Sequence, residues 1–177
     1  MGLGMLKQDS SPGRLIPLGH GKFAVVDEED YERVVEHRWY AVQFPRSTVP
    51  YVLGEMAGFG IKIFLHRFIL RIFDERRIDH RDANPLNNRK ENLRLCTHQQ
   101  SMQNRPKNKT NKSGFKGVYW DKLNNKWAAR IGYNSKSIYL GGFKDPSAAA
   151  RAYDRAARRY HKDFARLNFP KPGEQGA

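Results

Sequence analysis

An aspartate and a histidine stand side by side at positions 79 and 80, at the end of a short predicted strand. A loop rich in polar side chains follows them, up to Asn92. Hydrolysis of a phosphodiester needs a base that activates water and a divalent cation that neutralises the charge building on the phosphate. Asp79 and His80 can supply both if the strand bends there, because successive strand side chains point to opposite faces. Alone, such a pair is more often a structural hydrogen bond, so both interpretations stay open at this point.

A longer stretch around this pair resembles the HNH endonucleases, specifically the homing-endonuclease branch. The resemblance runs from about residue 15 to residue 105 and includes Leu65-His66-Arg67 and Asn92-Leu93-Arg94-Leu95-Cys96-Thr97-His98. It implies a ββα-metal core, in which two strands, the polar loop between them and a helix hold one metal ion. It also implies three roles: Asp79 is a metal ligand, His80 is the general base that takes a proton from water, and Asn92 orients His80.

The chain departs from the family pattern at Ser101, where the resemblance implies a second metal ligand that is usually Asn or His. A serine hydroxyl is a shorter, neutral ligand, and magnesium seldom prefers it to amide or carboxylate oxygen. Three explanations of Ser101 remain open. It marks a natural loss of activity, a deliberate inactivating change, or a tolerated variation in which water completes the metal's coordination shell. Gln100, Gln103 and Asn104 are substitutes if the helix shifts register. We expect one divalent metal, Mg²⁺ in first place and Mn²⁺ as the alternative.

Two more histidines and one cysteine belong to the same region. His66 and His98 have apolar neighbours, which favours a structural or phosphate-contacting role over that of the base. No zinc is expected, because cysteine pairs and closely spaced histidines are lacking. Cys96 cannot form an internal disulfide and is interpreted as a packing residue in a short strand. We therefore expect an intracellular, cytoplasmic protein, and the resemblance suggests a bacterial or phage-infected host cell.

The charge of the chain predicts its partner. It carries 32 Lys and Arg residues against 18 Asp and Glu residues, a formal net charge of +14. Such an excess favours a polyanion, with nucleic acid as the leading candidate. Double-stranded DNA is the partner that the family resemblances imply. No membrane partner is expected, because the apolar runs are short and interrupted.

The C-terminal part resembles the ethylene-response-factor (Apetala) type of DNA-binding domain. The resemblance spans nearly all of residues 113–170, including Ser113-Gly114-Phe115-Lys116-Gly117-Val118-Tyr119-Trp120. It implies a three-stranded sheet in the major groove, with a helix behind it. The implied DNA contacts are Lys116, Tyr119, Lys126, Arg130 and Tyr139, with Trp120 as a further candidate, whereas Trp127, Phe143 and Tyr153 are placed between sheet and helix.

This module differs from its plant counterparts where they read bases with arginine, because Tyr119, Asp121, Gly132 and Ser137 stand at such places. We therefore expect a different target and a larger share of phosphate contacts, with steep salt dependence.

Periodicity indicates the elements that position these residues. Strands are predicted at residues 23–26, 39–42, 51–53 and 93–97, with a helix after Asp27. Gly58 and Gly60 mark a turn before the apolar residues 61–65. Three further strands at 115–120, 126–131 and 137–143 precede a helix that Asp145 caps and Pro146 begins.

We thus predict an α+β chain, in which an HNH ββα-metal nuclease domain is followed by a three-stranded antiparallel sheet on one helix. Its expected parts are a flexible arm (1–14), the nuclease domain (15–105), a basic linker (106–113), the ethylene-response-factor-like domain (114–170) and a tail (171–177).

Three functions remain in competition. The first is a site-directed, homing-endonuclease-like enzyme, expected as a monomer with a dimer left open. The second is a DNA-binding regulator or catalytically impaired HNH protein, which Ser101 favours. A structural or RNA-binding role is third, because the basic linker would suit RNA but a sheet that reads a groove would not.

Overall fold

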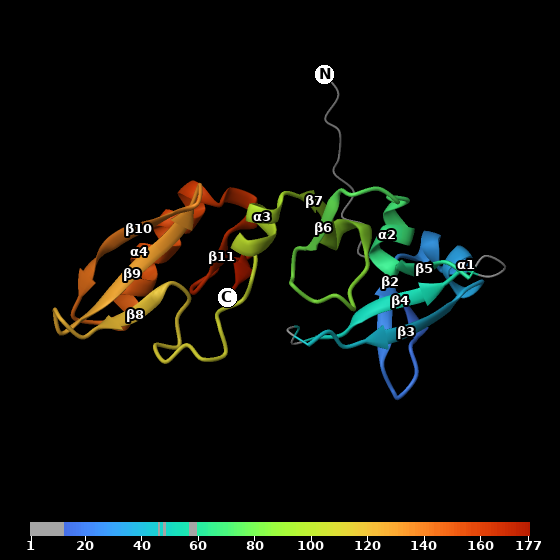
Figure 1. Cartoon of the computed structure of the whole chain (residues 1–177), viewed down its shortest axis with the longest axis horizontal. Coiled ribbons are helices and arrows are strands. Elements are labelled where there is room, and N and C mark those ends of the chain that lie inside the picture. Colours follow the sequence, from blue (N-terminus) through green and yellow to red (C-terminus); the bar gives the residue numbers. More distant parts are fainter. Residues whose placement is uncertain (1–12, 46, 48, 57–59) are drawn as a thin grey trace, which may run out of the picture. The chain divides into compact units, whose positions relative to one another are not determined.

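The computed structural model describes residues 13–45, 47, 49–56 and 60–177. Nearly all of the expected N-terminal arm, and Gly58 of the expected turn, lie outside the described residues. The chain is a mixed α/β protein with several small sheets and few helices (Figure 1). None of the helices in the described part is long and apolar enough to span a membrane.

The chain divides into two units. Unit 1 comprises the described residues up to His80 together with Asn84–Arg94, and unit 2 comprises Arg81–Ala83 and Leu95–Ala177. The expected domain boundary at residues 105/106 does not coincide with this division. Residues 95–105 and 81–83 pack with the C-terminal module, through contacts that neither periodicity nor composition could indicate.

Unit 1 is built from short elements that bury one face each. They are β1 (Arg14–Pro17), β2 (Phe23–Val26), α1 (Glu28–Val35), β3 (Arg38–Val42), β4 (Tyr51–Glu55), β5 (Lys62–Phe64), α2 (Leu65–Leu70), β6 (Arg77–His80) and the 3₁₀ helix η1 (Lys90–Asn92). β7 (Leu93–Cys96) begins in this unit and ends in unit 2. β1 pairs antiparallel with β2, β3-β4-β5 form an antiparallel sheet, and β6 neighbours β7.

Alternation along these strands explains the core of unit 1. Ala24 and Val26 of β2 are fully buried, whereas Phe23 is exposed. Trp39 lies in the centre and donates from its indole Nε1 to the carbonyl oxygen of Val34, at 2.8 Å. The opposite residue must be glycine, because a Cβ on Gly54 would lie 2.4 Å from the Trp39 ring. The predicted strands at 23–26, 39–42 and 51–53 and the helix after Asp27 are confirmed.

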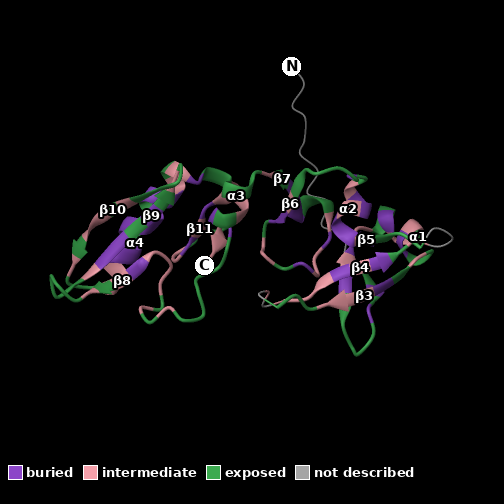
Figure 2. Cartoon of the chain, viewed as in Figure 1, coloured by how far each residue is buried: buried purple, intermediate pink, exposed green. Residues whose placement is uncertain are grey.

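Unit 2 contains a three-stranded antiparallel sheet with one long helix on one face (Figure 1). Its elements are α3 (His98–Gln103), β8 (Val118–Asp121), β9 (Lys126–Tyr133), β10 (Lys136–Phe143), α4 (Pro146–Tyr160), the 3₁₀ helix η2 (Lys162–Phe164), β11 (Arg166–Leu167) and β12 (Gln175–Gly176). Figure 2 shows the buried residues of α4 and β9. Alanines at 149, 150, 152, 156 and 157 let α4 lie close to the sheet.

Turn and cap chemistry explains why this part was predictable. The Asp145 side chain accepts a hydrogen bond from the Ala148 amide at 2.8 Å, and Pro146 begins α4, as predicted. Asn125 and Asn134 have positive φ angles of 49° and 48° in the two hairpin turns. Asparagine tolerates that region better than most residues. The first strand begins at Val118, later than the predicted residue 115.

Candidate functional site

Strands β6 and β7 hold the predicted metal ligand in a buried ion pair. Arg94 donates from Nε and Nη2 to Oδ2 of Asp79, at 3.0 and 2.8 Å. Their side chains are only 7% and 10% exposed. The arrangement fixes Asp79 at the end of β6, and it also shows that this carboxylate serves a structural arginine. Sequence reasoning included Arg94 in the family signature but did not predict the pairing.

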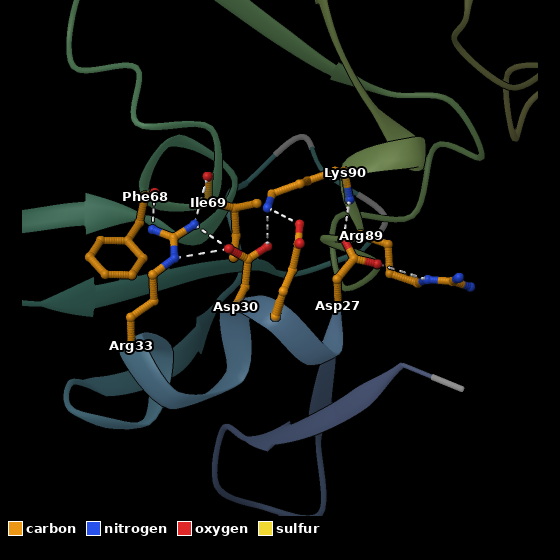
Figure 3. Close-up of polar contacts among 8 residues, drawn as sticks. Asp27, Asp30, Arg33, Phe68, Ile69, Arg89 and Lys90 are labelled. Atoms are coloured by element: carbon orange, nitrogen blue, oxygen red, sulfur yellow. Dashed lines mark hydrogen bonds and ion pairs between the residues drawn. The ribbon is translucent and has the colours of Figure 1, made fainter. Parts of the chain in front are cut away.

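Helix α1 anchors the polar loop where η1 begins (Figure 3). Asp27 accepts the Lys90 backbone amide at 2.7 Å and Arg89 Nε at 3.4 Å. Lys90 Nζ also pairs with Oδ2 of Asp30 at 3.1 Å, and Asp30 pairs in turn with Arg33 at 2.5 Å. Arg33 donates to two backbone carbonyl groups near the C-terminal end of α2, at 3.0 and 2.7 Å. Asp27 stands at the predicted N-cap position, but its side chain makes no cap hydrogen bond and holds the loop.

The backbone of β2 fixes the middle of the same loop. The Val25 amide donates to the Leu86 carbonyl, and the Asn88 amide donates to the Val25 carbonyl, both at 2.8 Å. Asn88 is fully buried as a result. Its Nδ2 donates to the Pro85 carbonyl at 3.1 Å, so its Oδ1 is the atom that lies 3.4 Å from Nε2 of His80. Sequence reasoning missed Asn88, because nothing in the pattern distinguishes it from the other asparagines of the loop.

Asn92, the residue expected to orient His80, is buried in η1. Its Nδ2 donates to the Asn87 carbonyl at 2.7 Å. This bond spans the base of the loop and supports the segment that carries Asn88.

An aromatic cluster surrounds the His80 ring, which is 6% exposed. The His66 ring lies edge-on to it with centroids 5.3 Å apart, and the His66 ring also stacks on Phe64 at 5.4 Å. Tyr51 contacts both histidines edge-on. Burial, with smaller contributions from His80 and Arg67, lowers the pKa of His66 to about 3. A neutral, packed ring agrees with the structural role expected for His66.

The described part of the expected metal site offers one carboxylate, that of Asp79, which is already paired with Arg94. Among the described residues, no group of three or more His, Cys, Asp or Glu side chains is arranged to hold a metal ion. Asp79 offers the carboxylate oxygen that Mg²⁺ favours, and one carboxylate can serve an arginine and a cation together. A magnesium ion held by one or two protein oxygens, with water and phosphate completing its shell, is compatible with this donor set.

Helix α3 belongs to unit 2 and carries Ser101. A capping box begins it: Thr97 accepts the Gln100 amide at 3.2 Å, and Oε1 of Gln100 accepts the Thr97 amide at 2.8 Å. Gln100, one of the substitute ligands, is therefore engaged at the helix start. The other two substitutes, Gln103 and Asn104, are buried, with exposed fractions of 8% and 2%. His98 is exposed.

Lys116, expected to contact DNA, is half-buried, and its ammonium group is directed toward backbone carbonyl groups of unit 2. Nζ donates to the Gln103 carbonyl at 2.6 Å and to the Arg105 carbonyl at 2.7 Å. Burial, with a smaller repulsion from Arg166, lowers the pKa of Lys116 to about 7. Gln103 is the last residue of α3 and Arg105 follows the C-cap residue, so this lysine binds the end of the helix that carries Ser101.

The other candidates divide between the two faces of the sheet. Tyr119, Arg130, Tyr139 and Lys126 lie on the face away from α4, where Arg130 is paired with Tyr139 in the register. The Arg130 guanidinium lies 4.8 Å from the Tyr119 ring centroid. Trp120 shares a face with Val118 and stacks edge-on with Trp127, at 5.1 Å between centroids. The open face is thus basic and aromatic, whereas Trp120 packs at the edge of the helix side.

Known proteins are similar both to the region around Asp79 and His80 and to the C-terminal module. A family model described as HNH endonuclease matches residues 74–103. Protein 3.8 of Escherichia phage T7 is 35% identical over 90 residues, which are 51% of this chain and 74% of that protein. APETALA2-like protein 2 of Oryza sativa subsp. indica is 42% identical over 57 residues, which are 32% of this chain but only 13% of that protein. No solved structure matches the chain.

One relative spans both units. An uncharacterized HNH endonuclease of Acanthamoeba polyphaga mimivirus is 32% identical over 160 residues, which are 87% of this chain and 79% of that protein. Its match extends far beyond residues 74–103 and covers most of both proteins. The chain therefore belongs to the HNH endonuclease family.

Proposed function

We propose that the chain is a site-directed, homing-endonuclease-like DNA endonuclease in which His80 is the general base. The observation that carries this proposal is the hydrogen-bond geometry of the loop. Because Nδ2 of Asn88 is directed to the Pro85 carbonyl, Oδ1 faces Nε2 of His80. An amide oxygen only accepts hydrogen bonds, so this contact favours a proton on Nε2 and leaves Nδ1 as the basic nitrogen of the neutral ring. At 3.4 Å the contact is long, and catalytic hydrogen bonds often tighten when substrate binds.

In this proposal Nδ1 of His80 takes the proton of a water molecule that attacks phosphorus. Asn88 holds the ring and stabilises the imidazolium that forms, since its Oδ1 accepts from Nε2–H. Asn92 supports Asn88 through the base of the loop, which is an indirect form of the orienting role expected for it.

Asp79 and Ser101 are proposed to hold one divalent cation, with Mg²⁺ preferred and Mn²⁺ as the alternative. The bound cation would neutralise charge on the phosphate and the leaving oxygen. Arg94 keeps the Asp79 carboxylate in a fixed orientation through two bonds to one oxygen. The shorter reach of Ser101 makes weak metal binding the expected cost of this departure from the family pattern.

The open face of the β8-β9-β10 sheet is proposed to bind double-stranded DNA in the major groove. Lys126 and Arg130 supply positive charge, and Tyr119 and Tyr139 supply aromatic surface beside it. Arg130 is held against Tyr119, which reduces the conformational freedom it would lose on binding. Lys116 is left out of the contact set because its ammonium group is bonded to the Gln103 and Arg105 carbonyls. Trp120 is 43% exposed but is left out because it shares the face of Val118, on the helix side of the sheet.

A supercoiled-plasmid assay tests the enzymatic proposal. The purified chain is incubated with the plasmid and Mg²⁺, with Mn²⁺, or with EDTA. Conversion to open circles or linear molecules with either metal, abolished by EDTA, is the expected result. Open circles would indicate nicking by one active site per monomer, and linear molecules would indicate paired cuts. If plasmids that contain sequences bound by the chain stay intact with both metals, the result contradicts the endonuclease proposal.

One observation favours a second function, that of a DNA-binding regulator or catalytically impaired nuclease. Asp79 is committed to a buried arginine, and the second ligand position is a serine. Under this alternative the chain binds duplex DNA with unchanged affinity in Mg²⁺ and in EDTA and cleaves in neither. The plasmid assay, run beside a gel-shift assay at matched salt, distinguishes the two functions.

A further inference from the structure

Lys116 is held rigidly by the C-terminal module. Its amide donates to Oδ1 of Asn168 at 2.6 Å, and its carbonyl accepts from Nδ2 of Asn168 at 3.1 Å. Asn168 is fixed in turn by Asp154 of α4, which accepts its backbone amide at 2.8 Å. The Lys116 ammonium group then reaches the Gln103 and Arg105 carbonyls at the end of α3. A chain of bonds therefore connects α4 to the carbonyl end of α3.

Arg166, the first residue of β11, makes a second set of contacts with the same region. Its Nη2 donates to the Asp82 carbonyl at 3.0 Å, and its Nη1 lies 3.4 Å from both the Arg81 carbonyl and Oδ1 of Asn104. Arg81 and Asp82 directly follow His80 in the sequence. One guanidinium group thus bridges the turn after His80 and the end of α3, both of which belong to unit 2.

The carbonyl groups at the end of a helix have no partners within that helix, and positive charge there is favourable. Helix α3 has only six residues, too few for stability in isolation. Tertiary contacts must therefore contribute to its stability, and the contacts of Lys116 and Arg166 with its C-terminal end lie within unit 2.

We propose that Lys116 and Arg166 are positioning residues of the nuclease, and that the C-terminal module is a structural part of the catalytic motif as well as its DNA-binding part. This rests on the proposed endonuclease function. The two side chains hold α3, with Ser101, and the turn after His80. The module that is proposed to bind DNA therefore also supports these segments.

The test replaces each side chain in the full chain: Lys116→Met and Arg166→Met. The matched controls are Lys171→Met and Arg155→Met, whose side chains are exposed. Single-turnover cleavage is measured at saturating DNA across a Mg²⁺ series, and DNA affinity is measured in EDTA. Small displacements of catalytic groups cost up to about 100-fold in rate. We expect a reduction of about 10- to 100-fold in rate, a higher Mg²⁺ requirement and unchanged affinity, while the controls cut like wild type.

Wild-type rates in both variants would overturn the proposal. A parallel loss of affinity and rate would overturn it as well, because it would show general destabilisation. Lys116→Arg keeps a cationic donor and is expected to recover part of the rate if Lys116→Met folds poorly.

Amide hydrogen exchange keeps this proposal separate from the endonuclease function. If the wild-type chain cuts no DNA, the proposed function fails, but the anchoring is still testable. Faster exchange in residues 98–105 of both Met variants, with α4 unchanged, would support the anchoring, and unchanged exchange there would overturn it.

Discussion

Acid should destabilise unit 1 through His66. The ring is stacked on Phe64, lies edge-on to His80 and is 9% exposed, and burial lowers its pKa from 6.5 to about 3. In the unfolded chain the same histidine takes up a proton near pH 6.5. Between these two values the unfolded state binds more protons than the folded state, so the free energy of unfolding falls as the pH falls.

The size of this effect follows from the pKa difference. Each pH unit corresponds to about 1.4 kcal/mol, so a shift of about three units makes His66 responsible for about 4–5 kcal/mol of lost stability. The decrease begins near pH 6.5 and is complete near pH 3. A change of this size approaches the whole stability of a small domain.

Urea unfolding followed by Trp39 fluorescence reports on unit 1, if Trp120 and Trp127 are replaced by phenylalanine. The variant His66→Gln removes the titrating group, and His20→Gln, at an exposed position, is the control. We expect the difference in unfolding free energy between the His66→Gln and parent chains to change by several kcal/mol between pH 7 and pH 4. Parallel pH curves for the two chains would refute the reasoning.

Three further results are expected. Ser101→Asn should raise the rate of Mg²⁺-supported cleavage without changing DNA affinity, and Mn²⁺ should partly restore cleavage by the wild-type chain. If the wild-type chain and Ser101→Asn cut at equal rates at limiting Mg²⁺, position 101 is not a metal ligand. The double variant Lys126→Ala/Arg130→Ala should bind DNA more weakly. Its slope of log affinity against log salt concentration should fall by about one for each phosphate that the variant no longer neutralises. An unchanged slope in titrations at several salt concentrations would show that this face is not part of the DNA interface. Gly117→Ala should destabilise unit 2 by about 2–5 kcal/mol, because its φ is +75° and the new Cβ would lie 2.1 Å from the Tyr153 ring. Thermal unfolding measures this loss, and Gly132→Ala, where a Cβ would enter open space, is the control.

Elements whose ends carry local chemistry were predictable from the sequence. Asp145 and Pro146 mark the start of α4, and turn asparagines separate the strands of the sheet. The short helix α2 was not predicted, because Ile61 to Leu65 resembles a strand and the helix after it has only six residues. Short elements depend on tertiary packing, which periodicity does not report.

The candidate site was predictable in its residue types and not in its contacts. The family pattern indicates Asp79 and His80, but the ion pair of Asp79 with Arg94 forms across the polar loop, between residues 15 positions apart, and depends on how β6 and β7 pair. Lys116 matched a DNA-contact position, yet a long side chain can turn inward where carbonyl groups lack partners. Asn88 could not be chosen among similar neighbours, because backbone bonds to β2 select it.

The role of His80 is tested most directly by His80→Ala, with His20→Ala as the exposed control. Plasmid cleavage in Mg²⁺ and DNA affinity in EDTA are measured on the same preparations. The proposed mechanism predicts that cleavage falls by at least about 100-fold, the contribution typical of a positioned base, with affinity unchanged within about twofold. Cleavage by His80→Ala at the control rate would contradict the central claim, and a parallel loss of affinity would make His80 a structural residue.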